Sequence, residues 1–491
     1  MKTSAFISFS CLGLLFLTSC VSGDYTVPTL RDELKYEETE HYEIDKEWWK
    51  LYGNDELNRL VDLALQRNPD YLKSALKVER ERYVLRKSDA DLFPTLSGAL
   101  NASAERRIDT HDDFHKRFSG EIGLKYELDL YGKIRDANSA EEFEMMATVL
   151  DKDAAELSLV NSVIDLFYNL EFLNNAIELT KGNIKTYEDL CQIAENKNAN
   201  GKIDDLEVVQ AKRSLLAEKN KLLELEMKLK DNENSLRNIL GYRQDEALDI
   251  KYTNLLEHKD IDVDLDLPMY VLANRPDLKA AQYRVEKAFK NMRAEDKSWY
   301  PSITLKGALN SSSEKFRDAF EIPYVFGSIA ISLPFLDWTR VYSNIKISEA
   351  DYNVAVIGFK DTLNRAVNEL AYYYYAYQHT KTLFGNMKDN YENTKKITGY
   401  YHNRYEMGKA EFKDFLEAMN AENSIHKEII QQKYQIVKYE NYIYKSLAGR
   451  YVKRPVAAND NAGTVENNIS ADKMVDNGNG DNAVDNKKTE N

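Results

Sequence analysis

The stretch GEIGLKYELDLYGKIRD, residues 120–136, joins the two kinds of element that this sequence predicts. Apolar side chains at every second position alternate with polar or small ones as far as Leu130. A period of two predicts a β-strand with one apolar and one polar face. From Asp136 onward there is no proline, and Gly182 is the only glycine before Gly201. At 1.5 Å per residue, such a helix reaches about 100 Å.

The predicted helix turns back near Gly201 and continues to about Gly241. Apolar residues recur at intervals of three and four, with charged residues between them, which is typical of coiled coils. A second stretch of the same character extends from Arg340 to Gly408 and back to Gly449. Antiparallel helix pairs of this length favour a long bundle or tube over one compact domain.

Three pairs of short motifs recur in the same order with one offset, 207 residues. They are Asn68-Pro69-Asp70 with Arg275-Pro276-Asp277, Phe93-Pro94-Thr95-Leu96 with Tyr300-Pro301-Ser302-Ile303, and Gly201-Lys202 with Gly408-Lys409. This agreement predicts an internal two-fold repeat. We assign the two units to residues 55–250 and 262–450, with an equatorial linker at residues 251–261.

Each unit is expected to contain a helix, a pair of strands and a long helical hairpin. The first helix is expected from Asp55 to Leu92, before Pro94. The strand pairs are expected at about residues 95–130 and 302–336, and the hairpin tips near residues 201 and 408. Strands of about ten residues suit a tilted crossing of a bilayer, and a small soluble sheet is the alternative.

The two ends of the chain differ from the rest in composition. Residues 1–19 combine a lysine, an apolar stretch and small residues, which predicts a secretion signal. Leu17-Thr18-Ser19-Cys20 resembles a bacterial lipobox, so Cys20 is the expected lipidation site; an ordinary signal with an incidental cysteine is the alternative. Residues 20–54 would form the lipidated N-terminal segment, and the polar residues 451–491 a disordered tail.

Composition excludes several classes of protein. The net charge of −15 argues against a nucleic-acid binder, which would carry basic patches. Three cysteines without a CxxC pair support neither a disulfide framework nor a cysteine-based zinc site. The sequence also contains no HExxH motif and no phosphate-binding loop. We therefore expect no metal site and no nucleotide-driven step in this chain, while the absence of a cofactor is implied only by the family resemblance given below.

Four strands per chain cannot close a barrel, because closure needs about eight or more. Open sheet edges are not tolerated in lipid. If the strands span a membrane, several chains must share one barrel, and the long helices must extend far from it. The pattern therefore predicts an oligomeric pore with a helical extension.

A succession of short blocks covers nearly the whole chain: Trp48-Trp49, Leu57-Asn58-Arg59-Leu60, Ala64-Leu65, Asn68-Pro69-Asp70, Phe93-Pro94-Thr95-Leu96, Glu127-Leu128-Asp129-Leu130-Tyr131-Gly132-Lys133-Ile134-Arg135, Arg275-Pro276-Asp277-Leu278 and Leu333-Pro334-Phe335. In this order the blocks resemble those of the TolC-like outer-membrane efflux lipoproteins. The resemblance covers about residues 16–452.

The resemblance implies a membrane α/β-barrel fold. This is a homotrimer with a shared twelve-stranded outer-membrane β-barrel, a periplasmic α-helical coiled-coil barrel and a mixed equatorial domain. It implies an exit duct that performs no chemistry, so the chain is not expected to be an enzyme. The implied partners are a periplasmic membrane-fusion adaptor, an inner-membrane transporter of the RND type and outer-membrane lipid. The implied location is the outer membrane, with a lipid anchor and an extension into the periplasm.

The function implied by the resemblance is passive export of drugs or other small toxic molecules from an inner-membrane pump to the exterior. An exit channel for type I protein secretion is a second hypothesis. A lipid-anchored coiled-coil scaffold without a pore is a third. The period-two strands favour a pore over a scaffold, because a scaffold has no need of them.

Family members close the tunnel with acidic residues six and nine positions after a glycine turn. After Gly408 these positions hold Asp414 and Glu417, and after Gly201 the sixth position holds Glu207. The resemblance therefore implies a periplasmic gate in which carboxylates surround the pore axis and attract cations. A solvated helix face is the alternative. Glu417 stands where an aspartate is more usual, and its longer side chain leaves the geometry of the gate undetermined at this point.

The turns themselves resemble the tips that contact the adaptor. The implied contact residues are Gly201, Lys202, Gly408 and Lys409. A tight reversal of the chain would also account for the glycines, because glycine tolerates the backbone conformation of such turns. An aromatic run, Tyr372 to Tyr375 with Tyr377, is expected to pack between helices and not to line the tunnel.

Overall fold

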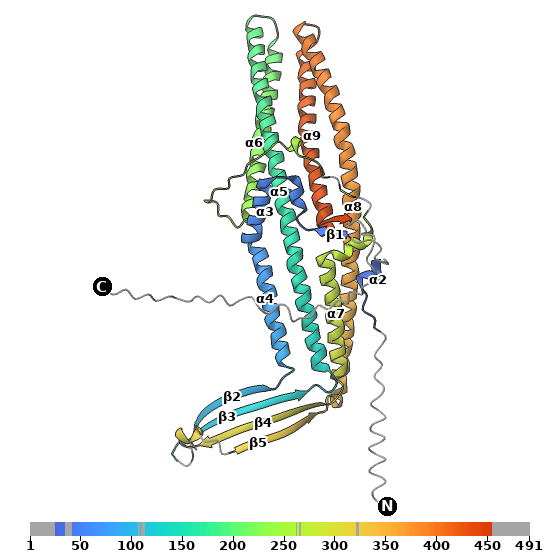
Figure 1. Ribbon diagram of the computed structural model, residues 1–491. Helices are drawn as coiled ribbons and strands as arrows, with labels where there is room; N and C mark the ends of the chain where they lie inside the picture. The colour runs from blue at the N-terminus through green and yellow to red at the C-terminus, as the bar shows by residue number, and fades with distance from the viewer. Residues whose placement is uncertain are drawn as a thin grey trace, which may run out of the picture.

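The computed structural model describes residues 25–34, 42–106, 109, 113–261, 263–264, 267–320 and 324–453. The predicted signal sequence, the expected lipidation site Cys20 and the tail beyond Lys453 lie outside the described residues. The described chain forms a long rod, with a four-stranded sheet at one end and two helical hairpins at the other (Figure 1).

The order helix, strand, strand, long helix, helix occurs twice along the chain. The first set is α4 (Pro69–Ala90), β2 (Thr95–Glu105), β3 (His115–Leu128), α5 (Lys133–Ala199) and α6 (Asp205–Ile239). The second set is α7 (Pro276–Lys297), β4 (Ser302–Ser313), β5 (Tyr324–Ser332), α8 (Trp338–Glu406) and α9 (Phe412–Ser446). The shorter elements are α2 (Leu30–Leu34), β1 (Tyr42–Asp45), η2 (Trp48–Tyr52), α3 (Asp55–Arg67), η3 (Leu255–Glu257), η4 (Met269–Asn274), η5 (Arg317–Phe320), η6 (Pro334–Asp337) and β6 (Arg450–Lys453).

The four long strands form one antiparallel sheet in the order β2-β3-β4-β5. Gly307 in β4 lies opposite Leu124 of β3 and Gly327 of β5. The strands have 9 to 14 residues, close to the predicted ten. Large apolar side chains remain uncovered on the outer strands, among them Leu96 (75% exposed) and Val325 (85%). Within the described residues, neither β2 nor β5 has a partner on its outer side, so both edges of the sheet are open.

The helices lie side by side in two tiers (Figure 1). In the tier near the sheet, packing contacts connect α4 to α5, α5 to α7 and α7 to α8. In the tier near the tips, they connect α6 to α5, α5 to α9 and α9 to α8. Helices α5 and α8, of 67 and 69 residues, extend through both tiers and have the predicted length of about 100 Å. No helix in the described ranges is both long and apolar enough to cross a membrane.

The single helix predicted from Asp55 to Leu92 is wrong, because it is interrupted at Asn68 and forms α3 and α4. Pro69 disfavours helical backbone in the residue before it, and Asn68 is extended, with φ −61° and ψ 121°. The Asn68 side chain accepts hydrogen bonds of 3.0 and 2.9 Å from two N–H groups in the first turn of α4. Its amide also donates to the Ile239 carbonyl at the end of α6, at 2.8 Å.

In the second half of the chain, the start of α7 is joined to the end of α9 in the same way, with arginine in place of asparagine. Arg275 precedes Pro276 at the start of α7, and its guanidinium donates to the Ser446 carbonyl at the end of α9, at 3.5 Å. The same guanidinium pairs with Asp277 at 2.8 Å and with Glu369 at 3.5 Å. The starts of α4 and α7 are thereby fixed to the ends of α6 and α9.

Strands β1 and β6 form a short antiparallel ladder, which joins the N-terminal segment to the chain after α9. Gly449, with φ +139°, allows the close approach, since a Cβ there would lie 2.7 Å from the Asp45 carbonyl oxygen. Tyr451 in β6 is buried and donates to the Val271 carbonyl at 2.9 Å. Residues 451–453 therefore belong to a strand, whereas the prediction placed them in the disordered tail. A four-residue strand carries too little periodicity to be recognised.

The largest apolar core lies at mid-height, where η2, α3, α5, α6 and α9 meet. Trp48 is 1% exposed, and its indole N–H donates to the Asn441 side chain at 3.2 Å. The Asn441 amide in turn donates to the Asn161 carbonyl at 3.1 Å. This chain of buried hydrogen bonds links the N-terminal segment to both long hairpins.

The packing predicted for the tyrosine run holds for part of it. Tyr377 is buried, and its hydroxyl donates to the Ile261 carbonyl at 3.3 Å. For Tyr372 and Tyr375 the prediction is wrong in the single chain, because they are 57% and 60% exposed.

Glu440 is a fully buried carboxyl group in the mid-height core. Its carboxyl oxygens lie within hydrogen-bond distance of the hydroxyls of Tyr377 and Tyr52, at 3.3 and 3.5 Å. Burial, together with the negative charge of Asp260, raises the pKa of Glu440 to about 8, although Tyr377 and Lys433 act in the opposite direction. The folded core therefore favours the neutral acid.

We expect the free energy of unfolding to fall as the pH rises from about 4.5, the ordinary pKa of this carboxyl, to about 8. Across that window the unfolded chain has released the proton that the folded chain still holds. Glu440→Gln should remove this part of the pH dependence, whereas Glu428→Gln, at an exposed position of α9, should not. Thermal unfolding in detergent from about pH 5 to pH 9 measures the effect. Superimposable profiles for the wild type and Glu440→Gln would contradict it.

Candidate gate and helical tips

The two helical hairpins end in turns of the same geometry. Gly201 and Gly408 have φ of +68° and +69°, a conformation that favours glycine. The N–H of the following lysine, Lys202 or Lys409, donates to the carbonyl five residues earlier, at 2.9 and 2.8 Å. This bond is the one that closes a helix after a left-handed glycine. A Cβ on either glycine would meet no atom within 4 Å, so backbone conformation and not space selects glycine there.

Both tips lie at the end of the rod that is farthest from the sheet (Figure 1). Lys202 and Lys409 are exposed, and Met407 beside the second turn is 67% exposed. The structure therefore brings the four predicted tip residues to one end of the molecule, on two neighbouring hairpins.

The two acidic residues after Gly408 lie at the start of α9. Asp414 is half-buried and Glu417 is exposed, and Glu417 pairs with Lys413 at 3.7 Å. At helical spacing both lie on the side of α9 opposite to the buried Phe412 and Phe415. The single chain thus leaves both carboxylates on one face at its surface.

Glu207, the third predicted gate residue, has a different environment. Its carboxylate accepts a 3.2 Å hydrogen bond from the Tyr405 hydroxyl near the end of α8, so this bond joins one hairpin to the other. Burial raises the pKa of Tyr405 to about 12, and the charge of Glu207 adds to the shift. The ammonium of Lys197 on α5 lies 4.3 Å from the centre of the same ring. Tyr405 is therefore a link between the hairpins that is held by a carboxylate and a cation.

An apolar cluster beneath this bond also joins the hairpins. It consists of Tyr187, Cys191, Ala211, Phe412, Phe415, Leu416 and Met419. The Tyr187 hydroxyl on α5 donates to the Asn420 side chain on α9 at 2.6 Å. The spacing of the tips is therefore fixed by side-chain contacts between hairpins, in addition to the turns within each one.

Sequence reasoning misses Tyr405. Its counterpart at the 207-residue offset is Asn198, whose amide donates within its own turn to the Ile203 carbonyl at 3.1 Å. The repeat therefore gives no reason to select Tyr405. Its place three residues before Gly408 is a signal that could have found it.

The arrangement acts through charge and steric fit. In the part of the chain that the structure describes, no group of three or more His, Cys, Asp or Glu side chains could hold a metal ion. Surface carboxylates attract cations, and a hydrogen bond between hairpins holds their tips at a set distance.

Comparison with known proteins agrees with this architecture. The sequence profile of the family described as outer membrane efflux protein matches residues 60–242 and 267–449. Toxin and drug export protein A of Aggregatibacter actinomycetemcomitans is 39% identical over 437 residues, which cover 89% of this chain and 96% of that protein. Cation efflux system protein CusC of Escherichia coli strain K12 is 21% identical over 328 residues, which cover 66% of this chain and 71% of that protein.

Solved structures share the fold. A crystal structure of CusC superimposes with a TM-score of 0.76 at 19% identity, covering 87% of this chain and 99% of that one. The outer membrane protein VceC of Vibrio cholerae superimposes with a TM-score of 0.75 at 22% identity, covering 83% and 100%. The family profile spans most of the sequence and a relative at 39% identity spans nearly all of it, so this chain belongs to the outer membrane efflux protein family.

Proposed function

We propose that this protein is the outer-membrane exit duct of a tripartite efflux system. It passes drugs or other small toxic molecules passively from an inner-membrane pump, through the periplasm, to the exterior. The observation that carries the proposal is that each side of the single chain has an open sheet edge and uncovered apolar helix faces. A closed ring of copies satisfies both sides at once.

The open sheet edges support a shared barrel. In lipid, each unpaired backbone group costs several kcal/mol. β2 and β5 are the opposite edges of the sheet and carry exposed apolar side chains, including Leu100 (74%) and Ile329 (69%). Pairing β5 of one copy with β2 of the next is a head-to-tail contact that closes into a ring. Three copies then supply twelve strands, within the size range of outer-membrane barrels.

The outer helices near the tips carry matching apolar faces. On α6 the exposed residues are Leu206, Val209, Leu216, Leu223 and Met227. On α8 they are Tyr372, Tyr375, Leu383, Ile397 and Tyr400, followed by Met407 directly after the helix. At helical spacing each set falls within an arc of about 120°, as in the seam of a coiled coil. We infer that α8 of one copy packs against α6 of the next.

The tier near the sheet repeats this arrangement. Exposed apolar residues on α4 are Leu72, Leu76 and Tyr83. Those on the first part of α8 are Ile347, Val354 and Ile357. Since α4 and α8 are the outer helices of this tier, one head-to-tail ring would cover the faces of both tiers and the sheet edges together.

We propose partners that match the two ends of the rod. The tips around Gly201 and Gly408 contact a periplasmic membrane-fusion adaptor, which connects the duct to an inner-membrane transporter of the RND type. Acylated Cys20 holds the N-terminus at the outer membrane beside the barrel. Relatives named for drug export and for cation efflux support small-molecule cargo.

A second candidate function is an exit channel for type I protein secretion. The name of the relative at 39% identity couples toxin export with drug export, and this observation favours keeping the candidate. A lipid-anchored scaffold without a pore would account for the long helices, but it would not explain why the chain forms an apolar four-stranded sheet.

We further propose that Asp414 and Glu417 surround the pore axis at the periplasmic end and form a cation-selective gate. Glu207 contributes through its bond to Tyr405, which holds the two hairpins of each chain together in the closed state. The two roles predict different mutant phenotypes.

Charges placed in the apolar face of α6 should prevent ring closure. Leu216→Glu combined with Leu223→Glu would put unpaired carboxylates into the interface, and the trimer fraction should fall by about tenfold or more in native mass spectrometry. Glu226→Lys, at an exposed position on another face of α6, is the matched control. An unchanged oligomer distribution in the double variant would rule out this face as the interface.

The purified protein should conduct ions in a planar bilayer, with a preference for cations. Asp414→Asn combined with Glu417→Gln should reduce the ratio of cation to anion permeability several-fold, because the constriction loses its charge. Glu428→Gln, farther along α9, should leave the ratio unchanged. If even the neutralised variant conducts nothing, the proposed pore is wrong and a scaffold is favoured.

Tyr405→Phe should open the gate more often. The substitution keeps the ring in its cluster and removes the bond to Glu207, worth about 1 kcal/mol, which changes an open–closed equilibrium by about fivefold. Tyr401→Phe is the control, because its ring packs against the same cluster. Single-channel open probability measures the effect, and equal values for the two variants would refute the role of the Tyr405 hydroxyl.

A further inference from the structure

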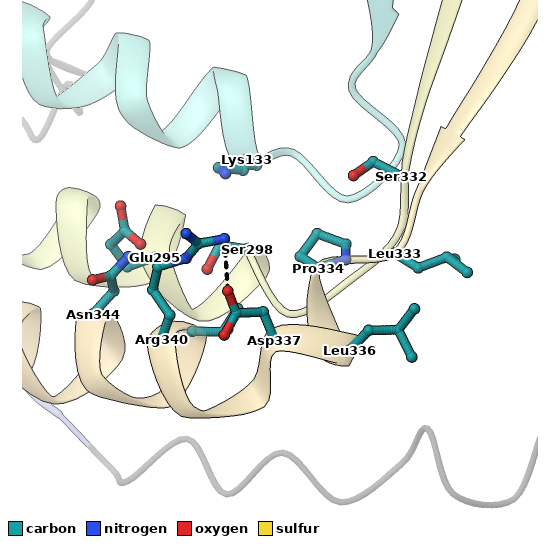
Figure 2. Close-up of a pocket in the computed structure, with 11 residues that line it drawn as sticks. Lys133, Glu295, Ser298, Ser332, Leu333, Pro334, Leu336, Asp337, Arg340 and Asn344 are labelled. Carbon is teal, nitrogen blue, oxygen red and sulfur yellow. Dashed lines mark ion pairs between the residues drawn. The ribbon is translucent and has the colours of Figure 1, made fainter.

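A cavity of about 600 Å³ lies at the junction between the sheet and the helices. Its walls come from the start of α5, the end of α7, the last residue of β5, and the segment from η6 into α8 (Figure 2). The junction is where the strands of the proposed barrel end and the periplasmic helices begin. The cavity therefore lies at the depth where lipid headgroups meet the protein.

The polar side of the cavity carries charges of both signs. Lys133 lies across the cavity from Arg340 and Asp337, which pair with each other at 2.7 Å (Figure 2). Glu295 on α7 lies beside Arg340 in the same view. Among the described residues, Lys133 and Glu295 form no ion pair, so each can take a ligand group without losing a protein partner.

A buried hydroxyl adds a second, independent indication of a ligand. Ser298 is one of the residues that line this cavity, and its Oγ atom is shielded from solvent and has no hydrogen-bond partner in the described structure. A buried polar atom without a partner is costly, and native proteins nearly always satisfy it. A hydrogen-bonding group inside the cavity would satisfy Ser298 if the hydroxyl rotates toward the cavity on binding.

The opposite side of the cavity is apolar and faces the strands. Leu333 and Leu336 are 43% and 72% exposed and extend toward the strand side (Figure 2). Trp338 is 62% exposed, and Tyr131 stacks on Tyr300 with ring centres 4.5 Å apart. Aromatic side chains of this kind are typical of the membrane–water boundary. The cavity thus has charged groups on its helix side and apolar groups on its strand side.

We propose that this cavity binds the phosphoethanolamine headgroup of a membrane phospholipid, with the acyl chains passing over Leu333 and Leu336. The proposal rests on the outer-membrane location put forward above. Lys133 and the Ser298 hydroxyl hold the phosphate, and Glu295 with Asp337 holds the ammonium group. The site would fix the sheet–helix junction at a constant depth in the membrane.

The balance of charge selects this headgroup over an anionic one. Lys133 and Arg340 oppose Glu295 and Asp337, so the charged lining is neutral overall. A headgroup that carries only a phosphate charge would leave the carboxylates without a partner, whereas a zwitterion pairs with both signs. The Arg340–Asp337 pair is largely exposed, at 76% and 52%, and such pairs contribute little, so a ligand can separate them.

The experiment uses the full-length protein, purified in detergent, stripped of lipid and titrated by native mass spectrometry. The two probes are phosphatidylethanolamine and phosphatidylglycerol with the same acyl chains. We expect phosphatidylethanolamine to bind about tenfold more tightly. Lys133→Ala should weaken it about tenfold, and Glu295→Gln should remove the preference between the two lipids.

The control is Lys346→Ala combined with Glu349→Gln. This variant removes a 2.7 Å ion pair on α8 between two residues that do not line the cavity. This variant should keep the wild-type preference. Equal binding of both lipids to the wild type, an unchanged preference in Glu295→Gln, or an unchanged affinity in Lys133→Ala overturns the proposal. Conductance recorded on the same preparations separates the two levels: a conducting protein without the lipid preference refutes this site alone, and a non-conducting one refutes the duct.

Discussion

The unpaired backbone groups along β2 and β5 are the constraint on which the rest of the molecule depends. Four strands cannot satisfy them alone in lipid, so in the ring that we propose the fold is completed by copies of itself. The helices emerge from the same strands and must obey the same head-to-tail order. Apolar faces on α4, α6 and α8, which are the outer helices of the two tiers, meet this requirement. The head-to-tail order that pairs the strands would thus also pack the helices, although strands pair by backbone hydrogen bonds and helices by apolar side chains.

Local patterns account for the elements of this fold, and long-range contacts account for their arrangement. The alternation up to Leu130 predicts a strand, and Gly201 and Gly408 predict the tips, because these features act within a few residues. The two tiers could not be predicted in this way, since the Asn68 contact with Ile239 joins residues 171 positions apart. The same limit applies to the site. Asp414 and Glu417 follow from the family resemblance, whereas the bond from Tyr405 to Glu207 spans 198 positions and leaves no trace in local spacing.

The two hairpins share their turn geometry and differ in their electrostatics. Asp414 and Glu417 remain at the surface of α9, while Glu207 on α6 is engaged by Tyr405. The α8–α9 hairpin therefore carries surface carboxylates, whereas the carboxylate of the α5–α6 hairpin is bonded to the other hairpin of the same chain. The gate that we propose would separate selectivity from closure, since the residues that attract ions would not be those that hold the helices together.

The junctions at Asn68 and Arg275 have a mechanical consequence. Helix α6 continues the direction of α4 along the rod, and α9 continues that of α7, although the helices of each pair are not consecutive in the chain. Each joint is bridged by a side-chain hydrogen bond to a carbonyl at the end of the upper helix. Such joints behave as pivots, while α5 and α8 behave as continuous rods that can only bend. In the proposed duct, these joints would let the legs of the hairpins swing at the periplasmic end while the barrel end keeps its circumference.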